Sequence, residues 1–245
     1  MTRFKAAAIH LSLSALVGLA LLAAFWFVWY PAPLFTAVGG LEIFVAVVTV
    51  DVLLGPLLTL VVYNEKKKSL KFDLAVIAAV QLAALAYGVL TLWDGRPVYV
   101  AALGFRFDVI QAAEVDAEEL RNSGKKLPIW GPTFVGTKPA ADTEEKTRVM
   151  FLAVAGVDYG HLPRYHVPLA EMRDKILKDI KPISELRTHN PGRDAEIAQW
   201  LRARNRPDES SVGYQGLKAR AQPMAVILDA KTAEVIGIAP FKPWD

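Results

Sequence analysis

The sequence predicts a membrane protein with three N-terminal transmembrane α-helices, followed by an α+β domain with a mainly antiparallel sheet. Hydrophobic residues make up 53% of the 245 residues and are concentrated before residue 94. They form three stretches long enough to cross ~30 Å of hydrocarbon at ~1.5 Å per helical residue. After Gly95 the composition is mixed, as in an ordinary folded domain. We therefore expect a three-span transmembrane domain over residues 1–94 and a folded domain over residues 95–245.

The three spans are expected at about residues 6–30, 41–63 and 72–93. A cleaved signal peptide is the alternative interpretation of the first span. Its apolar run exceeds the ~7 to 15 residues of such peptides, and it ends in Phe25–Tyr30 rather than in a small-residue cleavage site. Aromatic rings at span ends are typical of the membrane interface. The rings predicted there are those of Trp26, Trp29, Tyr30 and Trp93.

The distribution of basic residues predicts the orientation of the spans. Arg3 and Lys5 precede the first span, and no basic residue lies between the first two spans. Four lysines lie between the second and third spans, namely Lys66, Lys67, Lys68 and Lys71. The positive-inside rule places the N-terminus and this lysine loop in the cytoplasm, and the C-terminal domain in the periplasm, across the inner membrane of a bacterium. The same lysines could bind anionic lipid or a cytoplasmic protein, but the topology signal accounts for them.

Asp51 is a carboxylate in the middle of the second span, where its charge costs several kcal/mol unless it is paired, hydrated or protonated. Gln81 of the third span lies at a depth only ~4 to 5 Å different, and is its expected hydrogen-bond partner. Gly55 and Pro56 follow one turn later. Because proline has no amide hydrogen, a kink or a free Val52 carbonyl is expected there. The Asp51–Gln81 pair either joins two helices or forms a polar notch that binds a partner.

The C-terminal domain is predicted to close one sheet from strands at both ends of its sequence, over a middle set of helices. The expected strands are Pro97–Leu103, Phe105–Ala112, Leu217–Ala221, Met224–Leu228 and Glu234–Ile238. The expected helices are 116–121, 142–154, 169–180 and 192–204. Residues 127–139 and 158–168 are expected to be loops because they are rich in proline and glycine or in tyrosine and histidine.

No catalytic residue, cofactor or metal site is predicted. The chain has no cysteine, which excludes a disulfide and a thiol nucleophile, and it carries none of the common catalytic motifs. His161, His166 and His189 could be imagined around a metal ion, but their spacing matches no known ligand pattern. The formal charge of +3 gives no basic footprint for nucleic acid. The sequence therefore favours a non-enzymatic protein.

Nearly the whole chain resembles a known family, the type IV pilin accessory proteins called TfpX/TfpZ. The segments that carry the resemblance are Arg3–Lys5 with His10, Trp29–Leu34, Asp51–Thr59, Lys67–Leu74, Gln81–Gly88, Gly95–Pro97, Pro163–Tyr165, Val235–Gly237 and Pro243–Trp244. The resemblance implies a non-enzymatic accessory protein or chaperone of fimbrium biogenesis, which helps a cognate major pilin to be stable or competent for assembly by protein–protein interaction. Our hypothesis is that the three helices pack beside the pilin's transmembrane helix while the C-terminal domain contacts its periplasmic head. The cost of the Asp51 carboxylate adds the hypothesis that Asp51, beside Gly55, Pro56 and Gln81, satisfies a polar group of the partner's helix in the bilayer.

Two alternatives belong to other functional classes. A membrane-anchored periplasmic hydrolase would need His161 and His166 clustered with an acid such as Asp158. A small transporter or channel subunit would line a pathway with Asp51 and Gln81, and three spans would have to oligomerise to enclose it.

Overall fold

The computed structural model describes residues 1–245, and the chain divides into two compact units. The helix unit consists of Met1–Phe35 and Gly39–Arg96, and the sheet unit consists of Thr36–Val38 and Pro97–Asp245. The link between the first two spans therefore contributes a short segment to the sheet unit. There, the carbonyl of Ala37 accepts hydrogen bonds from the amides of Ala221 and Gln222, at 2.9 and 3.0 Å.

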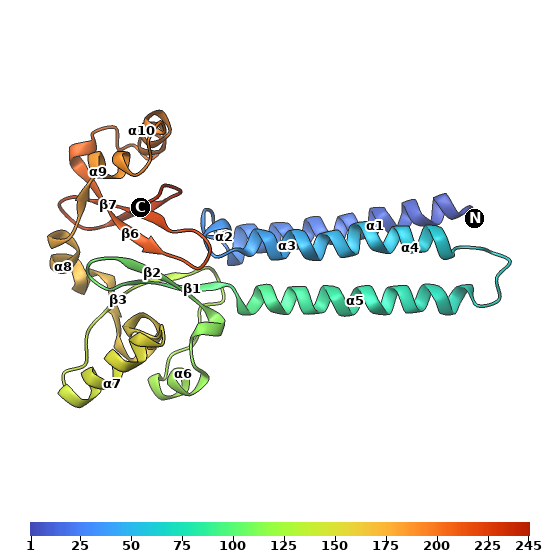
Figure 1. Cartoon of the computed structure of the whole chain (residues 1–245), viewed down its shortest axis with the longest axis horizontal. Coiled ribbons are helices and arrows are strands. Elements are labelled where there is room, and N and C mark those ends of the chain that lie inside the picture. Colours follow the sequence, from blue (N-terminus) through green and yellow to red (C-terminus); the bar gives the residue numbers. More distant parts are fainter. The chain divides into compact units, whose positions relative to one another are not determined.

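The helix unit contains three helices that are long and apolar enough to cross a membrane, Arg3–Trp29, Gly40–Val62 and Leu70–Asp94 (Figure 1). Each lies within a few residues of a predicted span. Their regular helical segments, with the short helix of the first link, are α1 (Arg3–Ala24), α2 (Leu34–Ala37), α3 (Gly40–Val48), α4 (Gly55–Val62) and α5 (Leu70–Asp94).

The first and second spans each contain a wider turn of π-helix, at Phe25–Trp29 and at Thr49–Leu54. In a π-helix each carbonyl bonds the amide five residues later instead of four. The second π turn joins α3 to α4 and contains Asp51. Such turns often occur at functional sites.

The sheet unit is built on an eight-stranded sheet in the order β4-β3-β1-β2-β6-β7-β8, with β5 paired to β6. The strands are β1 (Pro97–Ala102), β2 (Phe107–Gln111), β3 (Thr133–Thr137), β4 (His166–Pro168), β5 (Lys181–Pro182), β6 (Val212–Lys218), β7 (Met224–Asp229) and β8 (Val235–Ala239). Five pairings are antiparallel, but β1–β3 and β2–β6 are parallel. The prediction of a mainly antiparallel sheet was thus only partly right, because the sheet is mixed.

Five helices accompany the sheet: α6 (Ala117–Ser123), α7 (Thr143–Val154), α8 (Arg173–Lys178), α9 (Ile183–Thr188) and α10 (Asp194–Arg202). The Asp116 carboxylate caps α6 by accepting from the amides of Glu118 and Glu119, and Gly124 ends the helix at a φ of 66°. The Asp142 carboxylate caps α7 by accepting from the amide of Glu145 at 3.0 Å. The two N-termini are therefore where the sequence predicts them.

The apolar core on one face of the sheet lies between strands β6–β8 and the helices α9 and α10. Its buried members are Ile183, Leu186, Ile197, Leu201, Val212, Tyr214, Ala225, Ile227, Ala239 and Phe241. Trp200 packs against this cluster from α10. The apolar spacing predicted for the helix at 192–204 thus corresponds to its buried face.

Several local predictions were wrong because tertiary pairing decides them. The expected loop 127–139 contains β3, which is held between β1 and β4. The expected loop 158–168 ends in β4, and α9 was not predicted at all. The expected helix 169–180 splits into a 3₁₀ turn at Leu169–Met172 and the shorter α8. Strands of two to five residues carry little periodicity of their own.

Candidate functional site: a polar notch in the helix unit

A groove of about 260 Å³ opens between the first and third spans of the helix unit. α1 and α5 both pack against the second span, whose π turn places Asp51 in this groove. The groove is lined by His10, Leu13, Ser14 and Val17 of α1, by Asp51, and by Ala78, Gln81, Leu82 and Leu85 of α5. A second hollow of about 270 Å³ shares His10, Leu13 and Ala78 with it and extends toward Met1 and Tyr63. The walls are mostly apolar, and their polar members are Asp51, Gln81, His10 and Ser14.

The π turn and Pro56 together create the notch. In a π-helical register the Asp51 carbonyl would accept from the amide of residue 56, which is proline and has none. The side-chain amide of Gln81 donates to this carbonyl instead, at 3.1 Å. The sequence prediction, which assumed a regular α-helix, placed the free carbonyl at Val52 and paired Gln81 with the Asp51 carboxylate. The pairing was wrong, because Gln81 donates to the Asp51 carbonyl and not to its carboxylate.

Gly55 makes this contact possible. A Cβ atom at Gly55 would overlap the side-chain amide of Gln81, which would have to move away. Only glycine therefore lets the Gln81 side chain reach across to the second span at this level. Gly55, Pro56 and Gln81 act together on one carbonyl, and the Asp51 side chain takes no part in it.

Two buried oxygen atoms at the notch have no hydrogen-bond partner, Oδ1 of Asp51 and Oε1 of Gln81. Asp51 is only 8% exposed. An unpaired polar atom away from water costs about 1 to 3 kcal/mol, and more when it is charged. The notch is therefore a set of acceptors that a ligand with N–H or O–H donors would satisfy.

His10 and Thr59 form a second polar contact beside the groove, and this pairing was not predicted from the sequence. His10 Nδ1 lies 2.7 Å from the Thr59 hydroxyl, and Thr59 is buried. The sequence does mark His10, because it is the only histidine in the three spans. This contact joins α1 to α4.

The aromatic residues predicted at the interface gather at the ends of the first and third spans. The rings of Trp29 and Trp93 meet edge to face at 5.0 Å, and the Arg96 guanidinium lies 3.7 Å from the centre of the Trp93 ring. The Tyr30 hydroxyl donates to the carbonyl of Leu92. Trp26 instead contacts Phe35, at 5.7 Å. These contacts tie the first span to the third at one end of the helix unit.

The lysine loop lies with the N-terminus at the other end of the helix unit. The Met1 amine pairs with Glu65, and Lys67 pairs with Asp73 at 2.6 Å. Lys66, Lys68 and Lys71 form no ion pair, which leaves their charges available to solvent or lipid phosphates.

The three histidines of the sheet unit each have a different partner. His161 Nδ1 lies 3.1 Å from the Asp158 carboxylate, His166 Nε2 lies 2.8 Å from the Gly160 carbonyl, and His189 contacts Asp245. No group of three potential metal ligands is present. Burial pushes the pKa of His161 down, but Asp158 outweighs it and holds this pKa above its ordinary value.

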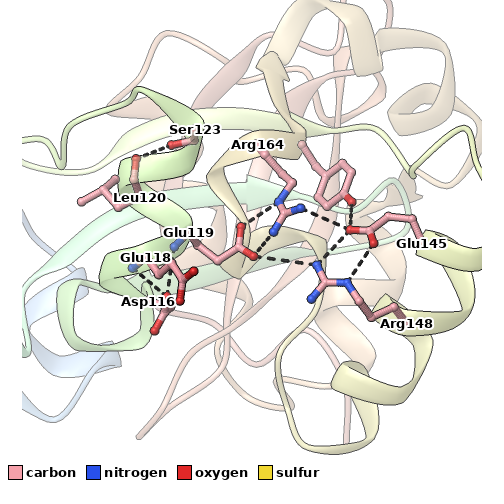
Figure 2. Close-up of polar contacts among 9 residues, drawn as sticks. Asp116, Glu118, Glu119, Leu120, Ser123, Glu145, Arg148 and Arg164 are labelled. Carbon is pink, nitrogen blue, oxygen red and sulfur yellow. Dashed lines mark hydrogen bonds and ion pairs between the residues drawn. The ribbon is translucent and has the colours of Figure 1, made fainter.

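A surface network of charged side chains holds α6 and α7 to the turn Pro163–Tyr165 (Figure 2). Arg164 bonds Glu119 of α6 and reaches Glu145 of α7 at 3.4 Å. Glu145 also accepts from Arg148 and from the Tyr165 hydroxyl, and these bonds lower its pKa to about 2. In a capping box, the Glu145 side chain would accept a hydrogen bond from the backbone amide of Asp142. Here it bonds Arg148 and Tyr165 instead.

The known proteins to which this chain is similar are fimbrial assembly proteins. A fimbrial assembly protein of Dichelobacter nodosus serogroup E1 is 29% identical over 186 residues, 74% of this chain and 72% of the relative. The serogroup I protein matches equally. The protein of serogroups C1 and C2 is 36% identical over 109 residues, 44% of this chain and 81% of the relative.

This chain belongs to the fimbrial assembly protein family. No family model matches the chain, and no solved structure matches it.

In this member of the fimbrial assembly family, the notch is the site with the clearest chemistry. It combines largely apolar walls with the unpartnered acceptors of Asp51 and Gln81. Such a site is suited to binding an apolar helix that carries one polar donor group.

Proposed function

We propose that this chain is a non-enzymatic accessory protein of type IV pilus biogenesis, which holds a major pilin in the bacterial inner membrane before assembly. In this proposal the N-terminus and the lysine loop are cytoplasmic and the sheet unit is periplasmic. The names of its relatives support a role in fimbrial assembly. The resemblance to TfpX/TfpZ proteins supports the choice of a pilin as the partner.

The observation that carries the proposal is the unpartnered carboxylate oxygen of Asp51 in the groove between the first and third spans. A pilin helix in this groove would cover Leu13 and Leu82, which are 59% and 65% exposed. A hydrogen-bond donor on that helix would satisfy Asp51 Oδ1, and the polar contact would fix the depth of the helix.

The proposed topology fits the same partner. A pilin that waits in the membrane has one apolar helix with its N-terminus inside and a head outside, as the resemblance implies. The groove would then bind the pilin helix in the membrane, and the sheet unit would contact the pilin head outside it. Both contacts would contribute to holding it.

The test is photo-crosslinking in the native bacterium, with a photoreactive amino acid at Leu82 or at Val80. Both positions lie on α5 and are exposed, at 65% and 61%, and their depths differ by only ~3 Å. Leu82 lines the groove, whereas Val80 lies ~160° away around the helix. We expect pilin adducts from Leu82 and few from Val80.

Equal adducts from both positions, or none from Leu82 at equal protein level, would reject the groove as the pilin site. Intact piliation in a deletion strain would reject the wider function. In that case the transporter alternative, which uses the same Asp51 and Gln81, would be tested by conductance of the purified protein.

A further inference from the structure

Ile129 and Trp130 form an exposed apolar tip on the loop between α6 and β3. They are 56% and 79% exposed in the sheet unit. A large ring and a branched chain held side by side in solvent mark an interaction site. The groove proposed above does not include them.

The base of this loop is fixed to the rest of the sheet unit. The Lys125 ammonium donates to the carbonyls of Pro163 and His166 at 2.8 and 2.9 Å. Leu127 packs against the buried cluster around Val98 and Tyr99. Proline at 128 and at 132 stiffens the chain on each side of the tip.

The register of the sheet places the tip at the end from which the chain leaves for the third span. β3 runs parallel to β1 with Thr133 opposite Tyr99, so that the residues before β3 lie at the same end as those before β1. β1 begins at Pro97, three residues after α5 ends at Asp94. Three residues of chain reach at most ~10 Å.

The link between the first two spans is bound to the turn that follows β6. β2 is antiparallel to β1 and β6 is parallel to β2, so β6 runs toward the end of the sheet at which β1 begins. Its last residues, Leu217 and Lys218, pair with Phe107 and Asp108 at the start of β2. The amides of Ala221 and Gln222, just beyond β6, bond the Ala37 carbonyl of that link. The turn that holds this link therefore follows a strand directed toward the end of the sheet from which the chain leaves for the third span.

We propose that Ile129 and Trp130 insert into the interfacial layer of the lipid bilayer that the three helices cross. Tryptophan is enriched at that depth because its ring is apolar and its indole N–H is polar. Lys126, exposed in the same loop and without an ion pair, is placed to meet a lipid phosphate. The proposal requires that the helix unit spans a membrane, but it does not depend on the pilin.

The test uses the full chain, labelled with 5-fluorotryptophan, in nanodiscs of phosphatidylethanolamine and phosphatidylglycerol. Six tryptophan signals are assigned by single Trp→Phe substitutions. A lipid with a spin label on its headgroup is then added. We expect the Trp130 signal to broaden several-fold more than that of Trp244.

Trp244 is the internal control because it lines a hollow together with Phe105, in the turn between β1 and β2. That turn lies at the opposite end of the sheet. Ile129→Ser is expected to reduce the broadening of Trp130, whereas Phe105→Ser is not. The assignment is overturned if the lipid label leaves Trp130 unchanged and a water-soluble gadolinium chelate broadens it as strongly as Trp244. The loop would then be a contact for a protein.

Discussion

The side-chain amide of Gln81 hydrogen-bonds the main-chain carbonyl of Asp51, at 3.1 Å, and not its carboxylate. Gln81 thus replaces the amide that Pro56 lacks, and the Asp51 side chain stays without a partner. The contact that joins the helices and the group offered to a ligand are therefore separate. Substitutions can remove one and keep the other.

Substitution of Asp51 tests the ligand role. Asp51→Asn and Asp51→Ala both leave the carbonyl bond to Gln81 in place, so we expect no loss of thermal stability for the protein in detergent. Removal of the carboxylate should abolish most of the pilin recovered with the protein from native membranes. Unchanged pilin recovery and piliation with both variants, at equal protein level, would show that the carboxylate has no part in binding.

Gln81 and Gly55 are expected to be energetically coupled. Gln81→Ala leaves the Asp51 carbonyl unpaired and should cost about 0.6 to 1.7 kcal/mol of stability. Gly55→Ala should cost about 1 to 3 kcal/mol, because its methyl group displaces the Gln81 amide. In the Gln81→Ala background the same methyl group meets no amide, so the double variant should be more stable than the sum of the two losses predicts. Unfolding in detergent measures all four proteins.

The control for this cycle is Gly18→Ala in α1. A Cβ atom there would lie 3.7 Å from Val48, at ordinary van der Waals distance. We expect little loss of stability from this substitution and no coupling to Gln81. Additive losses for Gly55 and Gln81 would instead contradict the geometry of the notch.

His166 should make the sheet unit less stable in mild acid. The pKa of His166 is lowered from 6.5 to about 4, mainly because the imidazole is buried. The hydrogen bond to the Gly160 carbonyl raises this pKa in part, and the nearby charge of Lys125 lowers it slightly. In the unfolded chain, His166 takes up a proton below pH 6.5, whereas in the folded protein it stays neutral down to about pH 4. The free energy of unfolding is therefore highest above pH 6.5 and falls as the pH drops toward 4. The expected loss is about 3 kcal/mol.

Urea unfolding of the full chain between pH 7 and 4, followed by a probe in the sheet unit, measures this loss. His166→Gln should flatten the profile over that range. The comparison between the two proteins is needed because the raised pKa of His161 acts in the opposite sense. Equal slopes for both proteins would assign the acid sensitivity to other groups.

Single cysteines can test the topology, because the chain has none of its own. We expect a membrane-impermeant maleimide to label Glu144→Cys, at the start of α7, in cells whose outer membrane alone is permeabilised. Ser69→Cys, in the lysine loop, should be labelled only after the inner membrane is disrupted. The reverse pattern would invert the proposed orientation.

The sequence predicts the helical spans well because long apolar stretches depend on composition alone. It also predicts the capped N-termini at Asp116 and Asp142, where a single side chain decides the boundary. It fails for β3 and β4, because their pairing depends on partners distant in the sequence. The mixed character of the sheet has the same cause, since strand direction is set by the connections between strands and not by any one strand.

The candidate site was predicted in its members but not in its contacts. Asp51, Gly55, Pro56 and Gln81 do lie together, since depth along two antiparallel helices follows from residue counts. The π turn shifts the helical register by one residue, and no feature of Thr49–Leu54 announced it. In that register the Asp51 carbonyl faces residue 56, a proline, and Gln81 bonds this carbonyl while Asp51 Oδ1 stays unpaired.

The bond between Ala37 and the residues beyond β6 has a consequence for the order of synthesis. Ala37 leaves the ribosome directly after the first span, whereas Ala221 and Gln222 are made near the end of the chain. The sheet unit can therefore complete its contacts only after the second and third spans have been synthesised. Insertion of the helices would precede the final folding step, and a fragment that begins at Pro97 would lack one of its own acceptors.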